Sequence, residues 1–159
     1  MTKAILICGK ICSGKSSYAE SVRTKENAVI LSADEIMLSC FPHQLGDQHD
    51  IIGNKVETYL RKKALDILAT GTSIILDWGF WTKEGRMKNR AYFEEQGYKV
   101  EMHHVDITDE TWKRNIDSRN AQVLAGREDA YLVDDGLLKK LLGRFEEPED
   151  TEIDVVYRY

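Results

Sequence analysis

The residues best suited to chemistry lie near the start of the chain, where positions 9–16 read Gly-Lys-Ile-Cys-Ser-Gly-Lys-Ser. This is the pattern G-x-x-x-x-G-K-S, in which a glycine-rich loop ends in a lysine and a hydroxyl. Glycine permits backbone torsions that a Cβ would forbid, so that consecutive N–H groups can turn inward around an anion. An apolar strand at residues 3–8 precedes the loop, and a helix starting near Lys15 adds its positive end to it. The pattern therefore predicts a phosphate-binding loop.

The side chains of this loop predict a nucleoside triphosphate with magnesium as the ligand. We expect Lys15 to reach the β- and γ-phosphates as a point charge, and the Ser16 hydroxyl to ligate Mg²⁺. The residues expected to contact the nucleotide are Gly9, Lys10, Ile11, Cys12, Ser13, Gly14, Lys15, Ser16 and Ser17. The pattern does not identify the base or the group that receives the phosphate.

Length and composition predict a soluble globular protein. The chain has 159 residues, of which 42% are hydrophobic and 31% charged, and its apolar runs are too short to span a bilayer. The first strand begins at once, which leaves no room for a signal peptide. Three cysteines without metal-ligand spacing favour a reducing cytoplasm. A net charge of −5 argues mildly against a protein that grips a nucleic-acid backbone.

Apolar runs and amphipathic segments alternate through the rest of the chain. Short apolar runs predict strands at residues 28–31, 72–77, 98–106 and 153–157. Helical periodicity predicts helices at residues 34–38, 54–69, 83–96, 109–120 and 134–147. This alternation predicts a single α/β domain over residues 1–159, in which helices cover both faces of a parallel sheet.

Two segments carry more specific expectations. Residues 42–53 are polar and are predicted to form a loop. In the helix at residues 134–147, the spacing of Leu137, Leu138, Leu141 and Leu142 predicts that these leucines face inward.

Asp34 and Asp77 each come at the end of a predicted strand, as the phosphate-binding loop does. Ligands of open α/β sheets bind at the carboxyl ends of the strands, so we expect both carboxylates near the phosphates. Asp34 could accept a proton from an acceptor hydroxyl, or it could cap the helix that follows. Asp77 could hold the magnesium ion with Ser16, or it could be an ordinary turn residue.

The chain resembles the small P-loop kinases of the polynucleotide kinase, zeta-toxin and chloramphenicol phosphotransferase type. The residues that carry the likeness are Gly9–Ser16, Leu31–Asp34, Asp77, Arg86, Val105-Asp106 and Lys113-Arg114-Asn115. It is most similar to a bacterial branch described as ATP-binding, through Leu-Asp-Trp-Gly-Phe-Trp at Leu76–Trp81 and Phe-Glu-x-Pro at Phe145–Pro148. The resemblance implies a three-layer α/β/α P-loop NTPase fold, a five-stranded parallel sheet of order 2-3-1-4-5 and a helical lid after the fourth strand.

The resemblance also implies functional roles. ATP and Mg²⁺ would be the cofactors, Asp34 the base and Asp77 a magnesium residue. Arg114 and Arg119 would be catalytic lid arginines that neutralise charge on the γ-phosphoryl group, with Arg127 a weaker candidate. Solvated helix arginines paired with nearby acids are the alternative.

Two departures concern the phosphate acceptor. Related polynucleotide kinases carry an arginine three residues after the base, where this chain has Met37. They also tend to have Thr-Asn after the third-strand aspartate, where this chain has Trp78-Gly79. Trp78, Phe80 and Trp81 could stack on a ring-bearing acceptor or belong to the core.

The sequence therefore predicts a phosphotransferase that moves the γ-phosphate of ATP to a hydroxyl of a small molecule. A polynucleotide 5′-hydroxyl kinase is the alternative among enzymes, and an ATP-binding switch or slow ATPase is the alternative outside that class. The identity of the acceptor and the oligomeric state stay open.

Overall fold

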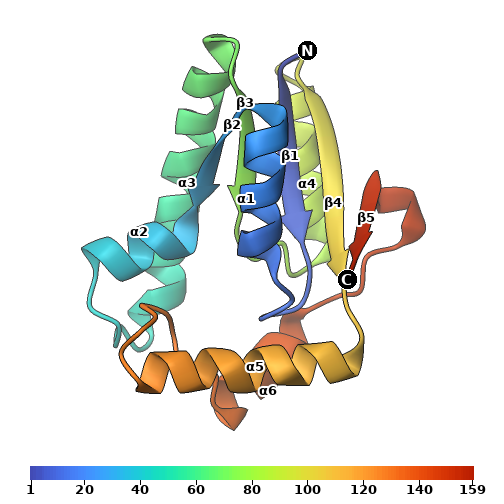
Figure 1. Cartoon of the computed structure of the whole chain (residues 1–159). Coiled ribbons are helices and arrows are strands. Elements are labelled where there is room, and N and C mark those ends of the chain that lie inside the picture. Colours follow the sequence, from blue (N-terminus) through green and yellow to red (C-terminus); the bar gives the residue numbers. More distant parts are fainter.

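Five parallel strands form one sheet in the computed structural model, which describes residues 1–159 (Figure 1). Their order across the sheet is β2-β3-β1-β4-β5. The strands are β1 (Lys3–Cys8), β2 (Ala28–Ser32), β3 (Ser73–Asp77), β4 (Lys99–Asp106) and β5 (Val155–Arg158). The predicted order 2-3-1-4-5 is confirmed.

The central strand β1 lies between β3 and β4, with Ala4 opposite Ile74 on one side and Val100 on the other. From Ala4 to Cys8 its side chains are fully buried. A parallel strand covered on both faces reads as a continuous apolar run, which is why Ala-Ile-Leu-Ile-Cys forms the middle of this sheet. The phosphate-binding loop follows directly from its carboxyl end.

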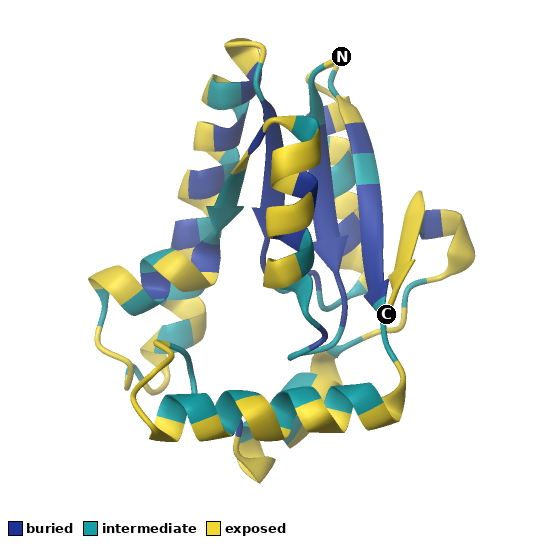
Figure 2. Ribbon diagram, viewed as in Figure 1, coloured by how far each residue is buried: buried dark blue, intermediate teal, exposed yellow.

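The helices cover the two faces of the sheet and the edge at which the strands end. They are α1 (Lys15–Glu26), α2 (Ala33–Cys40), α3 (Gln48–Ala69), α4 (Lys83–Glu94), α5 (Asp109–Leu124) and α6 (Asp135–Arg144), with a short 3₁₀ turn at Asp150–Glu152. On one face, Ala19 and Val22 of α1 pack against Ile5, Ile7 and Ile75 of the sheet. On the other face, residues of α2, α3 and α4 form a larger cluster with alternate strand residues. Figure 2 shows the central strands β1, β3 and β4 largely buried between helices whose outer sides are exposed, so the predicted three-layer α/β/α fold is confirmed.

Helices α5 and α6 occupy the region next to the carboxyl ends of the strands. In Figure 1 the central arrowheads point toward α5, which runs across that edge of the sheet. Thr108 caps α5, its side chain accepting a hydrogen bond from Thr111, and Asp134 caps α6 in the same way. This is the place where the resemblance puts a helical lid. None of the helices combines the length and the apolar character needed to cross a membrane.

Helix α3 begins six residues earlier than its periodicity indicates, so that the prediction of a loop over residues 42–53 is wrong for its second half. The first turn of α3 begins with Gln-His-Asp and continues with the exposed Ile51, so the helical period is not evident there. It is stabilised instead by a tertiary ion pair, because Asp50 accepts a hydrogen bond of 2.8 Å from Arg144 of α6. An acidic residue is also favourable near a helix N-terminus.

The leucines of helix α6 are less buried than the sequence pattern predicts. The helix contains no buried residue, and Leu142 is 40% exposed. Leu137, Leu138 and Leu141 are half-buried. The sequence pattern detects an amphipathic face, but α6 lies outside the two core clusters, so this face is only partly covered.

Candidate active site

The phosphate-binding loop joins β1 to α1 and owes its shape to two glycines. Gly9 and Gly14 have φ values of +155° and +91°. A Cβ on Gly9 would lie 2.7 Å from both Ser13 Oγ and the carbonyl oxygen of Val105. Unlike α2, α4, α5 and α6, helix α1 has no side-chain cap: Gly14 is its N-cap residue. The first amides of α1 are therefore free of intrahelical and capping partners and can bind an anion.

The Lys15 side chain folds back onto the phosphate-binding loop. Its ammonium donates hydrogen bonds of 3.0 Å and 2.9 Å to the carbonyl oxygens of Gly9 and Lys10. Burial lowers the pKa of Lys15, while the negative charges of Asp77 and Asp34 act in the opposite direction. A desolvated cation held within a glycine-rich loop is well placed to bind phosphate oxygens.

Ser16 and Asp77, predicted to share a magnesium ion, are brought together from α1 and β3. The Ser16 hydroxyl donates a hydrogen bond of 2.8 Å to Oδ2 of Asp77. Asp77 is only 8% exposed, and burial raises its pKa, although Ser16 and the charge of Lys15 oppose this. A hydroxyl beside a buried carboxylate that lacks an ion-pair partner is an oxygen donor set that suits Mg²⁺.

Asp34 lies in the first turn of α2, where its carboxylate is exposed. The helix is capped by Ser32, which accepts a hydrogen bond from the amide of Glu35, so Asp34 is not the cap. The charge of Asp34 contributes, after burial, to the pKa of Lys15 and Asp77. The structure therefore brings Asp34 into the same electrostatic cluster as the lysine and the candidate metal residues.

The predicted lid arginines have different surroundings. Arg119 reaches the loop, with its Nη1 3.6 Å from the Cys12 sulfur and its Nε buried without a partner. Arg114 is exposed and donates to Thr111 of its own helix. Arg127 is exposed in the segment after α5. In this conformation only Arg119 of the three contacts the phosphate-binding loop.

Three side chains to which the sequence analysis assigned no role bind consecutive carbonyl groups of the loop. Trp112 donates to the Ile11 carbonyl over 2.7 Å, and Asn115 donates to the Cys12 carbonyl over 2.9 Å. Tyr159 donates to the Ser13 carbonyl over 3.0 Å. Three carbonyl groups are thus held by side chains outside the loop. The three- and four-residue spacing of Trp112, Asn115 and Arg119 on one helix face is the signal that could have revealed them.

The aromatic residues after Asp77 divide between the two alternatives left open by the sequence. Trp78 and Phe80 are each 4% exposed and belong to the core. Trp81 is half-buried, and the Lys15 ammonium lies 5.8 Å from the centre of its ring. Of the three rings, Trp81 is therefore the one that lies over Lys15.

A cavity of about 360 Å³ opens beside these rings, between α3 and the start of α4. Its lining residues are Asn54, Glu57, Trp78, Phe80, Trp81, Thr82, Gly85, Asn89 and Arg144. Burial raises the pKa of Glu57, and the nearby charge of Asp34 adds to this shift, against the charge of Arg61. The cavity combines amide, hydroxyl and carboxylate groups with aromatic walls close to the phosphate-binding residues.

Residues 5–148 match the model of a protein family described as an AAA domain. The chain belongs to the AAA domain family. The resemblance to small P-loop kinases is thereby confirmed. No curated protein matches the chain at a significant level.

Among solved structures, the APS kinase of Mycobacterium tuberculosis in complex with AMPPNP and APS has a TM-score of 0.66 and 17% identity, covering 99% of this chain and 88% of that chain. A gluconokinase from Sinorhizobium meliloti has a TM-score of 0.63 and 14% identity, covering 98% and 82%. A chain of the Pnkp1/Rnl/Hen1 RNA repair complex has a TM-score of 0.68 and 19% identity, covering 90% and 43%. Proteins with different names share this fold, so the fold alone does not select the acceptor.

Proposed function

We propose that this protein is an ATP- and Mg²⁺-dependent phosphotransferase that moves the γ-phosphate to a hydroxyl of a small molecule. The observation that carries the proposal is the contact between Ser16 and Asp77 beside Lys15, with Asp34 in the same electrostatic cluster. These four residues come from three different elements. If these residues only stabilised the fold, a buried lysine in the electrostatic field of two carboxylates would not be needed.

The chain's own groups would bind and orient the nucleotide. The first amides of α1 bind phosphate oxygens, and Lys15 exchanges its bonds to the Gly9 and Lys10 carbonyls for bonds to the β- and γ-phosphates. Ser16 and Asp77 would hold the magnesium ion, which neutralises phosphate charge when bound. Arg119 would donate from its unpartnered Nε as charge develops on the γ-phosphoryl oxygens.

Asp34 would bind the acceptor. Its carboxylate accepts the proton of the acceptor hydroxyl while the hydroxyl oxygen forms the new bond to phosphorus and ADP leaves. The carboxylate is exposed and is not used as a helix cap, so both of its oxygens are free to bind the acceptor. Positioning of the two reactants supplies much of the rate in such a reaction.

A small acceptor fits this site better than a polynucleotide does. The cavity of about 360 Å³ beside Trp81 is within the usual range for small-molecule pockets. The net charge of −5 disfavours binding to the extended backbone of a nucleic acid. Three free thiols, Cys8, Cys12 and Cys40, support the expectation that the protein acts in a reducing cytoplasm.

The proposal is tested by ADP release from Mg-ATP in the presence of sugars, nucleosides, aminoglycosides and a 5′-hydroxyl oligonucleotide. We expect one class of small hydroxyl compound to stimulate release, and Asp34→Asn to lower this stimulation by about 10²–10⁴-fold, the usual contribution of a general base. Glu35→Gln is the matched control, because Glu35 is the exposed neighbour of Asp34 and should leave the rate unchanged.

Two results would contradict the proposal. Stimulation by the oligonucleotide alone would favour a polynucleotide kinase. ATP binding that no compound converts into faster ADP release, with equal rates for wild type and Asp34→Asn, would favour an ATP-binding switch or a slow ATPase.

A further inference from the structure

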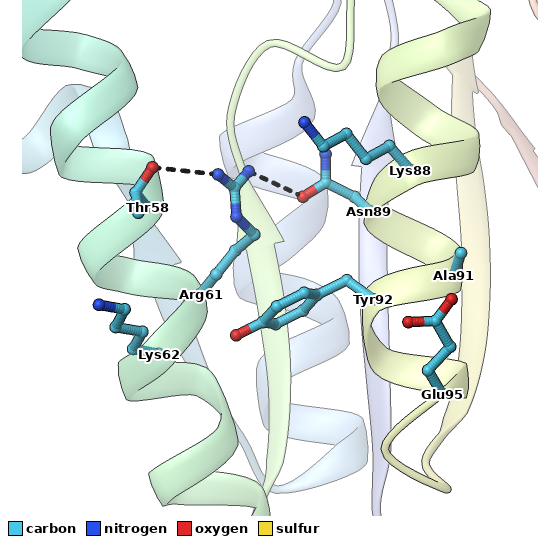
Figure 3. A pocket seen from close by; sticks show the side chains of 8 residues that line it. All are labelled: Thr58, Arg61, Lys62, Lys88, Asn89, Ala91, Tyr92 and Glu95. Carbon is cyan, nitrogen blue, oxygen red and sulfur yellow. Dashed lines mark hydrogen bonds between the residues drawn. The ribbon is translucent and has the colours of Figure 1, made fainter.

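A second cavity, of about 400 Å³, lies between α3 and α4 and contains no residue of the phosphate-binding loop (Figure 3). The residues that line it are Thr58, Arg61, Lys62, Lys88, Asn89, Ala91, Tyr92 and Glu95. Figure 3 shows the two helices side by side, with Arg61 reaching from α3 toward Asn89 and the ring of Tyr92 extending from α4 toward α3. The cavity is thus a groove between two neighbouring helices, which we call the α3–α4 groove.

The α3–α4 groove is positively charged in a protein whose net charge is −5. Arg61, Lys62 and Lys88 line it with a single acid, Glu95. None of these three cations forms an ion pair, whereas their neighbours Lys63 and Arg90 are paired with acids on the same helices. Like charges around one cavity repel one another, so an anion bound among them would be stabilised.

Two neutral side chains orient the guanidinium of Arg61. It donates to the Asn89 side-chain oxygen over 3.3 Å and to the Thr58 hydroxyl over 3.2 Å. Asn89 is 7% exposed and is fixed in turn by a hydrogen bond of 2.8 Å to the Gly85 carbonyl. The guanidinium is therefore oriented by neutral groups, and Glu57, the acid whose pKa its charge lowers, forms no ion pair with it. Its remaining N–H groups can bind an oxyanion in a bidentate manner.

The α3–α4 groove adjoins the cavity beside the phosphate-binding residues. Asn89 lines both cavities. On α3, Glu57 lines one and Arg61 the other, and residues four apart lie about 6 Å apart along a helix. One elongated small molecule could therefore occupy both cavities.

We propose that the α3–α4 groove binds an anionic group of the phosphoryl acceptor, a phosphate, sulfate or carboxylate, through Arg61, Lys62 and Lys88. This inference rests on the proposed function, since it assigns the hydroxyl end of the acceptor to the cavity near Asp34. The acceptor is then a small hydroxyl compound that already carries a negative charge, such as a sugar phosphate or a nucleoside monophosphate.

The first test measures binding without turnover. The nucleotide site is filled with Mg-AMPPNP, so that the phosphate-binding loop is occupied, and inorganic phosphate is titrated while amide signals of Gly85 and Asn89 are followed by NMR. We expect saturable shifts in wild type and at least about tenfold weaker binding in Arg61→Gln, as for loss of a hydrogen bond to a charged group. Lys25→Gln, an exposed cation at the far end of α1, should bind as wild type does.

The second test compares neutral hydroxyl compounds with their own monophosphates as acceptors. We expect wild type to prefer the phosphorylated member by at least about tenfold in kcat/KM. Arg61→Gln should remove this preference by raising KM for the phosphorylated member. Its kcat for the phosphorylated member, and its kcat/KM for the neutral member, should stay at the wild-type values. Thermal unfolding of Arg61→Gln at the wild-type temperature verifies that the fold is intact.

The outcomes separate this inference from the proposed function. Absence of phosphate binding with the loop occupied, or equal binding in wild type and Arg61→Gln, overturns the anion site whatever the kinase assay gives. If phosphate binds but kcat/KM is equal for the neutral and the phosphorylated member of each pair, the groove binds anions but not the anionic group of the acceptor. If no compound stimulates ADP release, the proposed function fails, and the assignment to an acceptor fails with it.

Discussion

Lys15 and Asp77 carry opposite charges in one desolvated corner of the sheet edge. Burial lowers the pKa of the lysine and raises that of the aspartate. The attraction between the two charges therefore offsets only part of the desolvation penalty of each. Groups shifted in this way are common at functional sites. A triphosphate facing Lys15 and a divalent cation facing Asp77 would each supply the missing opposite charge.

Loss of the Lys15 ammonium should abolish most turnover. We expect Lys15→Met to lower the ADP-release rate by at least about 10²-fold, because a preorganised charge on the transferred phosphoryl group is lost. Lys25→Met, at the exposed end of the same helix, is the control and should keep the wild-type rate. Steady-state ADP release checks both variants, and full activity in Lys15→Met would be incompatible with the proposed site.

At the scale of elements, α5 contacts the phosphate-binding loop through its side chains. Trp112 and Asn115 bind two neighbouring carbonyl groups of the loop, and Arg119 reaches the Cys12 sulfur. Cys12 itself has φ of +58°, a conformation that a non-glycine residue rarely adopts. Contacts from the outside therefore help to keep the loop in a shape that its own sequence does not favour.

Removal of these contacts should weaken nucleotide binding. We expect Trp112→Phe and Asn115→Leu each to raise the dissociation constant of Mg-AMPPNP by about 3–10-fold, the usual value of one hydrogen bond. Isothermal titration calorimetry measures the change, with Ser118→Ala on the exposed side of α5 as the control. Unchanged affinity in both variants would show that α5 does not shape the loop.

At the scale of the whole molecule, a buried ion pair joins the C-terminal segment to helix α4. Arg86 of α4 is fully buried and donates to both carboxylate oxygens of Glu152, over 2.8 Å and 3.2 Å. It also donates to the carbonyl groups of Phe80 and Glu146. This one guanidinium therefore connects the segment after β3, helix α4 and the segment that leads into β5.

Breaking this pair on one side should destabilise the protein strongly. We expect Arg86→Met to lower the free energy of unfolding by about 3–5 kcal/mol, because the Glu152 carboxylate stays buried without its partner. The double variant Arg86→Met/Glu152→Leu should recover most of this loss, since neither charge is then buried. Urea denaturation of both variants beside wild type checks the expectation, and a single variant as stable as wild type would refute it.

The same pair predicts an acid dependence. Hydrogen bonds from Arg86 lower the pKa of Glu152 from its ordinary value of 4.5, despite its burial. The stabilisation is therefore complete above about pH 4.5 and is lost as the pH falls through the lowered pKa. The urea midpoint should therefore fall more between pH 5 and pH 3 in wild type than in the double variant.

The local features of this protein were predictable from its sequence. Strand β1, the phosphate-binding loop and α1 follow each other without interruption, so their pattern fixes their geometry. The alternation of strands and helices, together with the resemblance to P-loop kinases, predicted the layers and the strand order. Asp34 and Asp77 were found because parallel strands bring their carboxyl ends to one edge.

Contacts between distant residues were decided only by the tertiary structure. Trp112 and Asn115 bind carbonyl groups of residues 101 and 103 positions away, and no local period encodes such a pairing. The first turn of α3 is joined by an ion pair to α6, 94 positions away. The α3–α4 groove exists because both helices pack on the same face of the sheet, which brings Arg61 of α3 to Asn89 of α4. Periodicity shows which face of a helix is buried, but the partner of that face is set by packing.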